Sequence, residues 1–203
     1  MRLVPVLLLC AMALGGCGAL SAVSDATEPL DAYTLSAVRA AATGSGRSHL
    51  VVPVASATGA VGTDRILVKP NRLQAAYLPA GRWVDPAPVL IQSLLIASLQ
   101  SGGGFRLVSR DDAGLTPDFT LLIDLTDFQA EAPAPAAGPW TVRVVLTATV
   151  ISEADRSIVA SRRFEAVASS PTDETVAVVQ GFDAVEEAAR DEIIVELRRP
   201  AHD

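Results

Sequence analysis

The stretch DFTLLIDLTDFQAE, residues 118–131, decides the fold together with the two stretches that follow it, WTVRVVLTATVIS at 140–152 and SIVASRRFEAVA at 157–168. All three are rich in the β-branched and aromatic residues that strands favour. Their connections are short: a Pro/Ala segment at 132–139 and the turn EADR at 153–156. Because short connections join antiparallel neighbours, the sequence predicts an antiparallel meander of three long strands.

Shorter β-rich segments precede the meander. HLVVPV at 49–54 is a short apolar run, and we expect it to be a central strand. The folded part begins with AYTL at 32–35. Three further strands are expected at 65–69, 74–84 and 105–109.

The segment DPAPVLIQSLLIASLQSGGGF at 85–105 predicts a helix. Asp85 is a good N-cap residue, and Pro86 suits the first helical position. Apolar residues recur at helical spacing after these two. Gly102, Gly103 and Gly104 supply the left-handed backbone with which many helices end.

A second helix is predicted near the C-terminus, with Ser170 as its cap and Pro171 as its first residue. Its apolar residues are three or four positions apart and form one stripe: Val178, Phe182, Val185, Ala189, Ile193 and Leu197. We expect this stripe to pack on the sheet; the alternative is that it docks on a partner. Together, the elements predict an α+β fold, two-layer, with a mostly antiparallel or mixed β-sheet and two main helices packed on one face.

The N-terminus carries a targeting signal. The apolar run at 3–14 is too short to span a bilayer, which takes about 20 residues, and fits the apolar region of a secretory signal. It ends in Leu14-Gly15-Gly16-Cys17, the pattern of a bacterial lipoprotein signal. We therefore expect residues 1–16 to be removed and Cys17 to be lipidated. The alternative is an ordinary secretory signal in which Cys17 is incidental.

The rest of the chain then divides into two parts. Residues 17–31 are the lipidated cysteine with a flexible tether, and 32–199 form a single α+β domain. Gly18 stands where aspartate would favour retention in the inner membrane, so we expect the outer membrane, on its periplasmic face. The formal net charge of −7 argues against nucleic acid as a partner and against a basic membrane-binding patch.

The sequence offers no catalytic constellation, and we expect no enzyme. The two histidines, His49 and His202, lie in no HExxH, CxxC or GxSxG motif. The hypothesis of a periplasmic hydrolase would depend on His49. The carboxylates Asp124 and Asp127 are three residues apart on a strand and are expected to face opposite sides of the sheet, so no metal site is predicted.

The segment TDRILVKPNRLQAAYLPAGRWVDPAPVLIQSLLIASLQSGGGFRLV at 63–108 carries a family resemblance. Asp64-Arg65 before a strand, then Arg82-Trp83, a proline and a Leu-rich helix that ends in Phe-x-x-Val resemble the ABC-type transport auxiliary lipoprotein family. PqiC-type lipoproteins belong to this family. The resemblance runs over roughly 32–197 and is clearest at 64–108.

The resemblance implies a role in lipid transport. Such lipoproteins are accessory or docking components of systems in which a mammalian-cell-entry (MCE) domain protein, an inner-membrane permease and an ATPase move phospholipids across the periplasm. It implies no cofactor beyond the covalent diacylglycerol and N-acyl lipid on Cys17, and it is compatible with a homo-oligomer. The alternative is an envelope lipoprotein outside transport that serves as a scaffold for cell-wall or outer-membrane assembly.

Three residues of the resembling segment are candidates for partner contact: Tyr77, Arg82 and Trp83. Aromatic residues and arginine are favoured anchors at protein interfaces. For Trp83 the alternative is packing at the start of the helix. Asp64 and Arg65 are expected to form a local ion pair, which contributes little if it is exposed.

Overall fold

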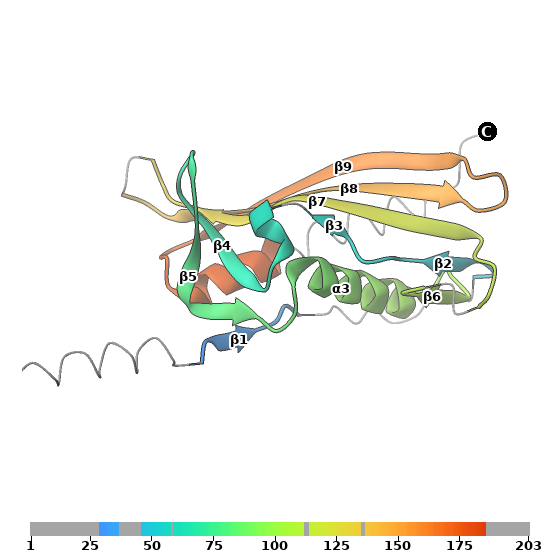
Figure 1. Cartoon of the computed structure of the whole chain (residues 1–203), viewed down its shortest axis with the longest axis horizontal. Coiled ribbons are helices and arrows are strands. Elements are labelled where there is room, and N and C mark those ends of the chain that lie inside the picture. Colours follow the sequence, from blue (N-terminus) through green and yellow to red (C-terminus); the bar gives the residue numbers. More distant parts are fainter. Residues whose placement is uncertain (1–28, 37–45, 58, 112–113, 135–136, 186–203) are drawn as a thin grey trace, which may run out of the picture. The chain divides into compact units, whose positions relative to one another are not determined.

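The computed structural model describes residues 29–36, 46–57, 59–111, 114–134 and 137–185 (Figure 1). The chain forms two compact units, residues 1–31 and 32–203. The predicted signal peptide, Cys17 and His202 lie outside the described residues.

The predicted meander is confirmed. Strands β7 (Phe119–Glu131), β8 (Trp140–Ser152) and β9 (Ile158–Ser170) are each 13 residues long. β8 pairs with β7 on one side and with β9 on the other, antiparallel in both cases and over almost the whole length of the strands. The three strands form the long upper layer in Figure 1.

The other edge of β7 is shared by three short strands, all parallel to it. They are β2 (His49–Val51), β3 (Ser56–Ala57) and β4 (Arg65–Asn71). A 3-10 turn, η1 (Gly59–Gly62), follows β3. The mixed sheet in the described residues has nine strands in all. Its remaining members are β6 (Leu107–Ser109), parallel to β2, β5 (Gln74–Trp83), antiparallel to β4, and β1 (Asp31–Tyr33), next to β5.

Helix α3 (Ala87–Gly102) begins one residue later than predicted. Pro86, and not Asp85, occupies the N-cap position, and no side chain caps the helix. A second proline, Pro88, lies in the first turn, where its missing N–H costs no hydrogen bond. The predicted glycine end is confirmed, because the left-handed Gly103 (φ 66°) and Gly104 (φ 103°) follow the last turn.

The C-terminal helix begins at residue 175, so the prediction that Ser170 caps it is wrong. Ser170 is the fully buried last residue of β9, and its hydroxyl donates to the carbonyl of Thr172. The predicted stripe is confirmed as far as the structure describes it: Val178, Phe182 and Val185 are buried. Ala189, Ile193 and Leu197 lie outside the described residues.

A cluster of three aromatic rings joins the layers. Trp83 of β5 lies 5.6 Å from Phe128 of β7 and 5.2 Å from Phe182 of the C-terminal helix, measured between ring centroids. Phe128 and Phe182 are 4.6 Å apart. Both helices lie on the same side of the β7–β9 layer (Figure 1), which confirms the predicted α+β arrangement.

Candidate functional site

The buried histidine does not form a catalytic pair. His49 is fully buried, and its Nε2 lies 2.8 Å from the Oγ of Ser109. The single hydroxyl hydrogen of Ser109 is donated to the carbonyl of Asp111, so Ser109 accepts from the His49 ring. Asp118 binds the backbone N–H of His49 at 2.6 Å and not its ring. A base must take the proton from its nucleophile, and this arrangement gives His49 no proton to take.

The prediction for the two aspartates of β7 is wrong, because the strand has a β-bulge between Leu125 and Asp127. Asp124 is opposite Thr147, and Asp127 is opposite Val145. Thr147 and Val145 are two positions apart on β8, so both aspartates face the same side of the sheet. They still take separate partners: Asp124 accepts from Ser56 at 2.7 Å, and Asp127 from Gln129 at 2.9 Å. The described residues hold no cluster of metal-ligating side chains.

Trp83 occupies the core. Its side chain is 1% exposed and belongs to the aromatic cluster. This position agrees with the packing alternative and leaves no surface of the indole for a partner in this structure. Its backbone N–H donates to the carbonyl of Asp64 at 2.6 Å, which fixes the end of β5 against the start of β4.

Tyr77 and Arg82, the other two candidates, reach the surface of the β4–β5 hairpin. The Tyr77 residue is 36% exposed, and the guanidinium of Arg65 lies 5.5 Å from the centre of its ring. The guanidinium of Arg82 lies 3.6 Å from the carboxylate of Asp64. Asp64 therefore forms its ion pair with Arg82 and not, as predicted, with the adjacent Arg65.

Two arginines meet on this hairpin. Arg65 and Arg82 are direct cross-strand partners, and like charges opposite one another are unfavourable. Arg65 donates to the carbonyl of Leu78, but its Nε is buried without a hydrogen-bond partner. Asp64 offsets one of the two charges, so the surface around Tyr77 keeps a positive character.

The tip of the same hairpin presents a leucine. Leu73 is 99% exposed, yet its turn is held by hydrogen bonds: the side chain of Asn71 accepts from the Leu73 N–H and donates to Gln74. A single exposed leucine is an ordinary feature of a protein surface. Leu73 lies at the tip of the hairpin, and Tyr77 and Arg82 lie further along β5. We call Leu73, Tyr77 and Arg82 the hairpin surface.

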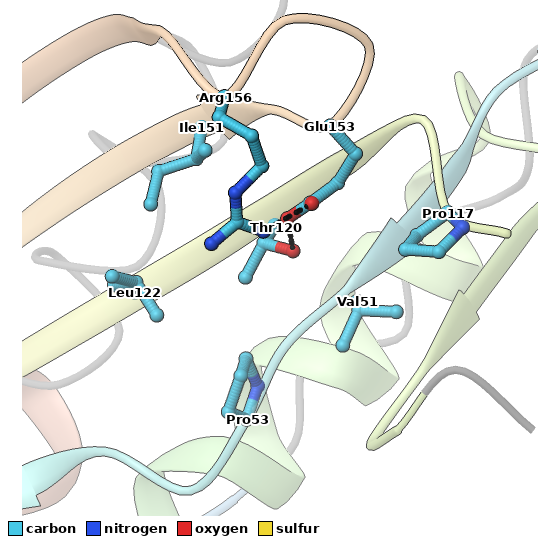
Figure 2. Close-up of a pocket in the computed structure, with 8 residues that line it drawn as sticks. All are labelled: Val51, Pro53, Pro117, Thr120, Leu122, Ile151, Glu153 and Arg156. Atoms are coloured by element: carbon cyan, nitrogen blue, oxygen red, sulfur yellow. Dashed lines mark hydrogen bonds and ion pairs between the residues drawn. The ribbon is translucent and has the colours of Figure 1, made fainter.

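A shallow groove lies at the end of the meander where β8 turns into β9 (Figure 2). Its volume is about 410 Å³, and residues from β2, β7, β8 and three loops line it: Val51, Pro53, Pro117, Thr120, Leu122, Ile151, Glu153 and Arg156. Glu153 accepts from the hydroxyl of Thr120 at 2.6 Å and pairs with Arg156 at 2.5 Å. The Thr120 hydrogen bond, and after it Arg156, lower the pKa of Glu153.

Arg156 has a left-handed backbone, with φ at 60°. This conformation costs a residue other than glycine about 1–2 kcal/mol. The turn between β8 and β9 requires this conformation, because the Ser152 N–H donates a hydrogen bond to the carbonyl of Ser157 and closes the turn. The groove was not predicted, since its residues come from segments about 30 to 100 positions apart in the sequence.

Comparisons with known proteins agree with this fold. Residues 33–193 match the family model described as "ABC-type transport auxiliary lipoprotein component". No curated protein sequence matches the chain. No helix in the described part of the chain is long and apolar enough to span a membrane.

Two solved structures have a similar fold. The crystal structure of protein XCC0632 from Xanthomonas campestris, of family DUF330, is 21% identical and has a TM-score of 0.70; the match covers 80% of this chain and 91% of that one. A second crystal structure, of a protein described only as uncharacterized, is 15% identical with a TM-score of 0.67, over 84% of this chain and 99% of that one. At these identities the likeness shows the fold alone.

Proposed function

The chain belongs to the family of ABC-type transport auxiliary lipoprotein components, and we propose that it serves an MCE-type lipid transport system as a non-catalytic docking component. In this role it binds the MCE-domain protein and, with it, the permease and the ATPase of the same system. The observation that carries the proposal is the family match, which covers nearly the whole of the unit 32–203.

The anchor in this proposal is the lipid on Cys17. The sequence Leu14-Gly15-Gly16-Cys17 follows an apolar run that is too short to span the membrane. Two or three acyl chains hold a protein stably on a bilayer, whereas one chain does so only marginally. We place the anchor in the outer membrane, with the folded domain in the periplasm.

The contact with the partner is proposed to use the hairpin surface. Leu73 is fully exposed, and Tyr77 and Arg82 are of the residue types that dominate binding energy at interfaces. Because Trp83 fixes the end of β5 in the core, Tyr77 and Arg82 are presented by a strand that is already ordered, and Leu73 by a turn that Asn71 holds. Binding there would cost little conformational entropy.

The experiment is a pull-down of the lipidated protein from membranes after mild crosslinking, with mass spectrometry of the captured proteins. Recovery of an MCE-domain protein with its permease and ATPase is expected. Recovery of cell-wall or outer-membrane assembly proteins instead would favour the scaffold role and contradict the transport role.

Variants of the hairpin surface test its part in the contact. Tyr77→Ala and Arg82→Ala should each reduce the recovery of the partner with an unchanged circular-dichroism spectrum, because Tyr77 lies at the surface and the exposed Arg82–Asp64 pair contributes little to stability. Arg156→Ala is the matched control, since it removes an exposed arginine at the groove and leaves the hairpin intact. Equal recovery with all three variants would show that the partner binds elsewhere.

A further inference from the structure

The meander ends in an open edge. β9 pairs with β8 and, within the part of the chain that the structure describes, with no other strand. It is 13 residues long, equal to β7 and β8, which are paired on both sides. β1 and β6, which also lie at edges of the sheet, have only three residues each. A row of unpaired N–H and C=O groups about 40 Å long is a template for another strand.

Proteins usually block such an edge with charge, a proline or a very short strand. β9 contains no proline, and its exposed apolar residues, such as Val167 at 53%, favour pairing over solvent. Its charged residues are Arg162, Arg163 and Glu165, in the middle of the strand. Charges of one sign would repel a second copy of the strand, but these have both signs.

The order of the charges makes β9 complementary to itself. In an antiparallel pair of two β9 strands centred on Phe164, Arg163 of one copy is opposite Glu165 of the other, and the reverse also holds. The same register places Ser161 opposite Val167, and Ala160 opposite Ala168. A two-fold interface has to be self-complementary in this way, and opposite charges across strands stabilise the pair.

Glu165 can take the additional arginine. In one copy its carboxylate already accepts from Arg163 at 2.8 Å and binds Arg143 of β8, and the hydrogen bond from Arg163 lowers its pKa. A carboxylate offers about four lone-pair sites. Arg163 is exposed, with 59% of its side chain open to solvent, and can reach across the edge.

The register also decides where the helices go. In this pairing, residues opposite one another are both odd-numbered or both even-numbered, so they point to the same face of the sheet in each copy. The two sheets therefore continue with their helix layers on the same face. In Figure 1, α3 lies below the β7–β9 layer, and it contacts β6 and η1. α3 therefore leaves the β9 edge free for a second sheet.

We propose that two copies of this chain associate through β9, antiparallel and centred on Phe164, to form one continuous sheet. The inference does not depend on the proposed transport role. It names the interface within a pair of copies and leaves the hairpin surface and the groove available for other partners.

Paired cysteines in the full-length protein test the register in membranes. Ser161→Cys/Val167→Cys should give a covalent dimer on oxidation, because residues 161 and 167 of two copies are opposite one another. In each single variant, and within one copy, the thiols are about 20 Å apart and should stay unlinked. The only native cysteines are Cys10, in the signal, and Cys17, the predicted lipidation site, so few free thiols compete.

Charge reversal tests the contact itself. Arg163→Glu or Glu165→Arg alone should lower the yield of dimer about tenfold or more, because like charges then meet on both sides of the two-fold axis. The exchange Arg163→Glu/Glu165→Arg should restore it. Folding of each variant is checked by circular dichroism, and thiol reactivity by maleimide labelling.

Three results would overturn the proposal. The folded, reactive double-cysteine protein could give no dimer; the single variants could crosslink as well as the double one; or the double variant could link to a different protein and not to itself. The last result would show that the edge accepts a strand from another chain.

Discussion

Gly181→Ala should destabilise the protein, although alanine is the better helix former. In an open helix this change would stabilise by about 1 kcal/mol. Gly181 lies in the helical residues 175–185, where that helix crosses β8, and a Cβ at this position would lie 2.7 Å from Cγ2 of Val142. Val142 is fully buried, and a β-branched side chain has few alternative rotamers. Overpacking of a core costs about 1–3 kcal/mol, so the net change should be a loss of up to about 2 kcal/mol.

A double-mutant cycle with Val142→Ala isolates the contact. Val142→Ala alone should cost about 2 kcal/mol, from two methyl groups at about 0.8 kcal/mol each and the cavity that they leave. In the double variant the new methyl group of residue 181 enters this space, so the double variant should be more stable than additivity predicts by about 1–3 kcal/mol. The assay is urea unfolding followed by circular dichroism. If Gly181→Ala alone raised the free energy of unfolding by the full helix-propensity value, the close approach of helix and sheet would be refuted.

Three further predictions concern the core, the groove and the anchor. Trp83→Ala should lower the free energy of unfolding by about 3–5 kcal/mol, as is typical for a buried aromatic residue. If the variant unfolded like the unchanged protein but no longer captured the partner, the result would favour the hypothesis that Trp83 contacts the partner. Because the Thr120 hydrogen bond lowers the pKa of Glu153 in the folded state, its contribution is present above pH 4.5 and is lost as the pH falls through the lowered pKa. Glu153→Gln should therefore flatten the acid side of the stability curve, and an unaltered curve would contradict this. Cys17→Ser should move the protein from the membrane to the soluble fraction with an unchanged circular-dichroism spectrum; continued sedimentation with membranes would reject Cys17 as the anchor.

The strand meander and the helix stripe were predictable because each depends on residues close in sequence. Apolar periodicity and short connections determine both. The helix starts were less predictable. Asp85 and Ser170 are good cap residues by type, but β5 ends only two residues before Asp85, and Ser170 is itself the last residue of β9. Strand pairing, a tertiary effect, decided these boundaries.

The faces of Asp124 and Asp127 show a second limit. Alternation along β7 predicts opposite faces, and one bulge between Leu125 and Asp127 reverses the phase. Nothing in the local sequence marks this bulge. The groove is likewise invisible in the sequence, because β2, β7 and the turn at Arg156 meet only through the pairing of distant strands.

The adjacent pair Arg82-Trp83 has two different roles, and the alternation of a strand is the reason. Neighbouring residues of β5 point to opposite faces, so when Trp83 enters the aromatic cluster Arg82 must point away from it. The chain has only nine aromatic residues, and three of them meet in this cluster, where β5, β7 and the C-terminal helix join. The packing of Trp83 in the core thus fixes one face of β5, and on the other face the carboxylate of Asp64 pairs with the Arg82 guanidinium. Of the two candidate contact residues in this motif, only Arg82 has its side chain at the surface, and Trp83 is the anchor that orients it.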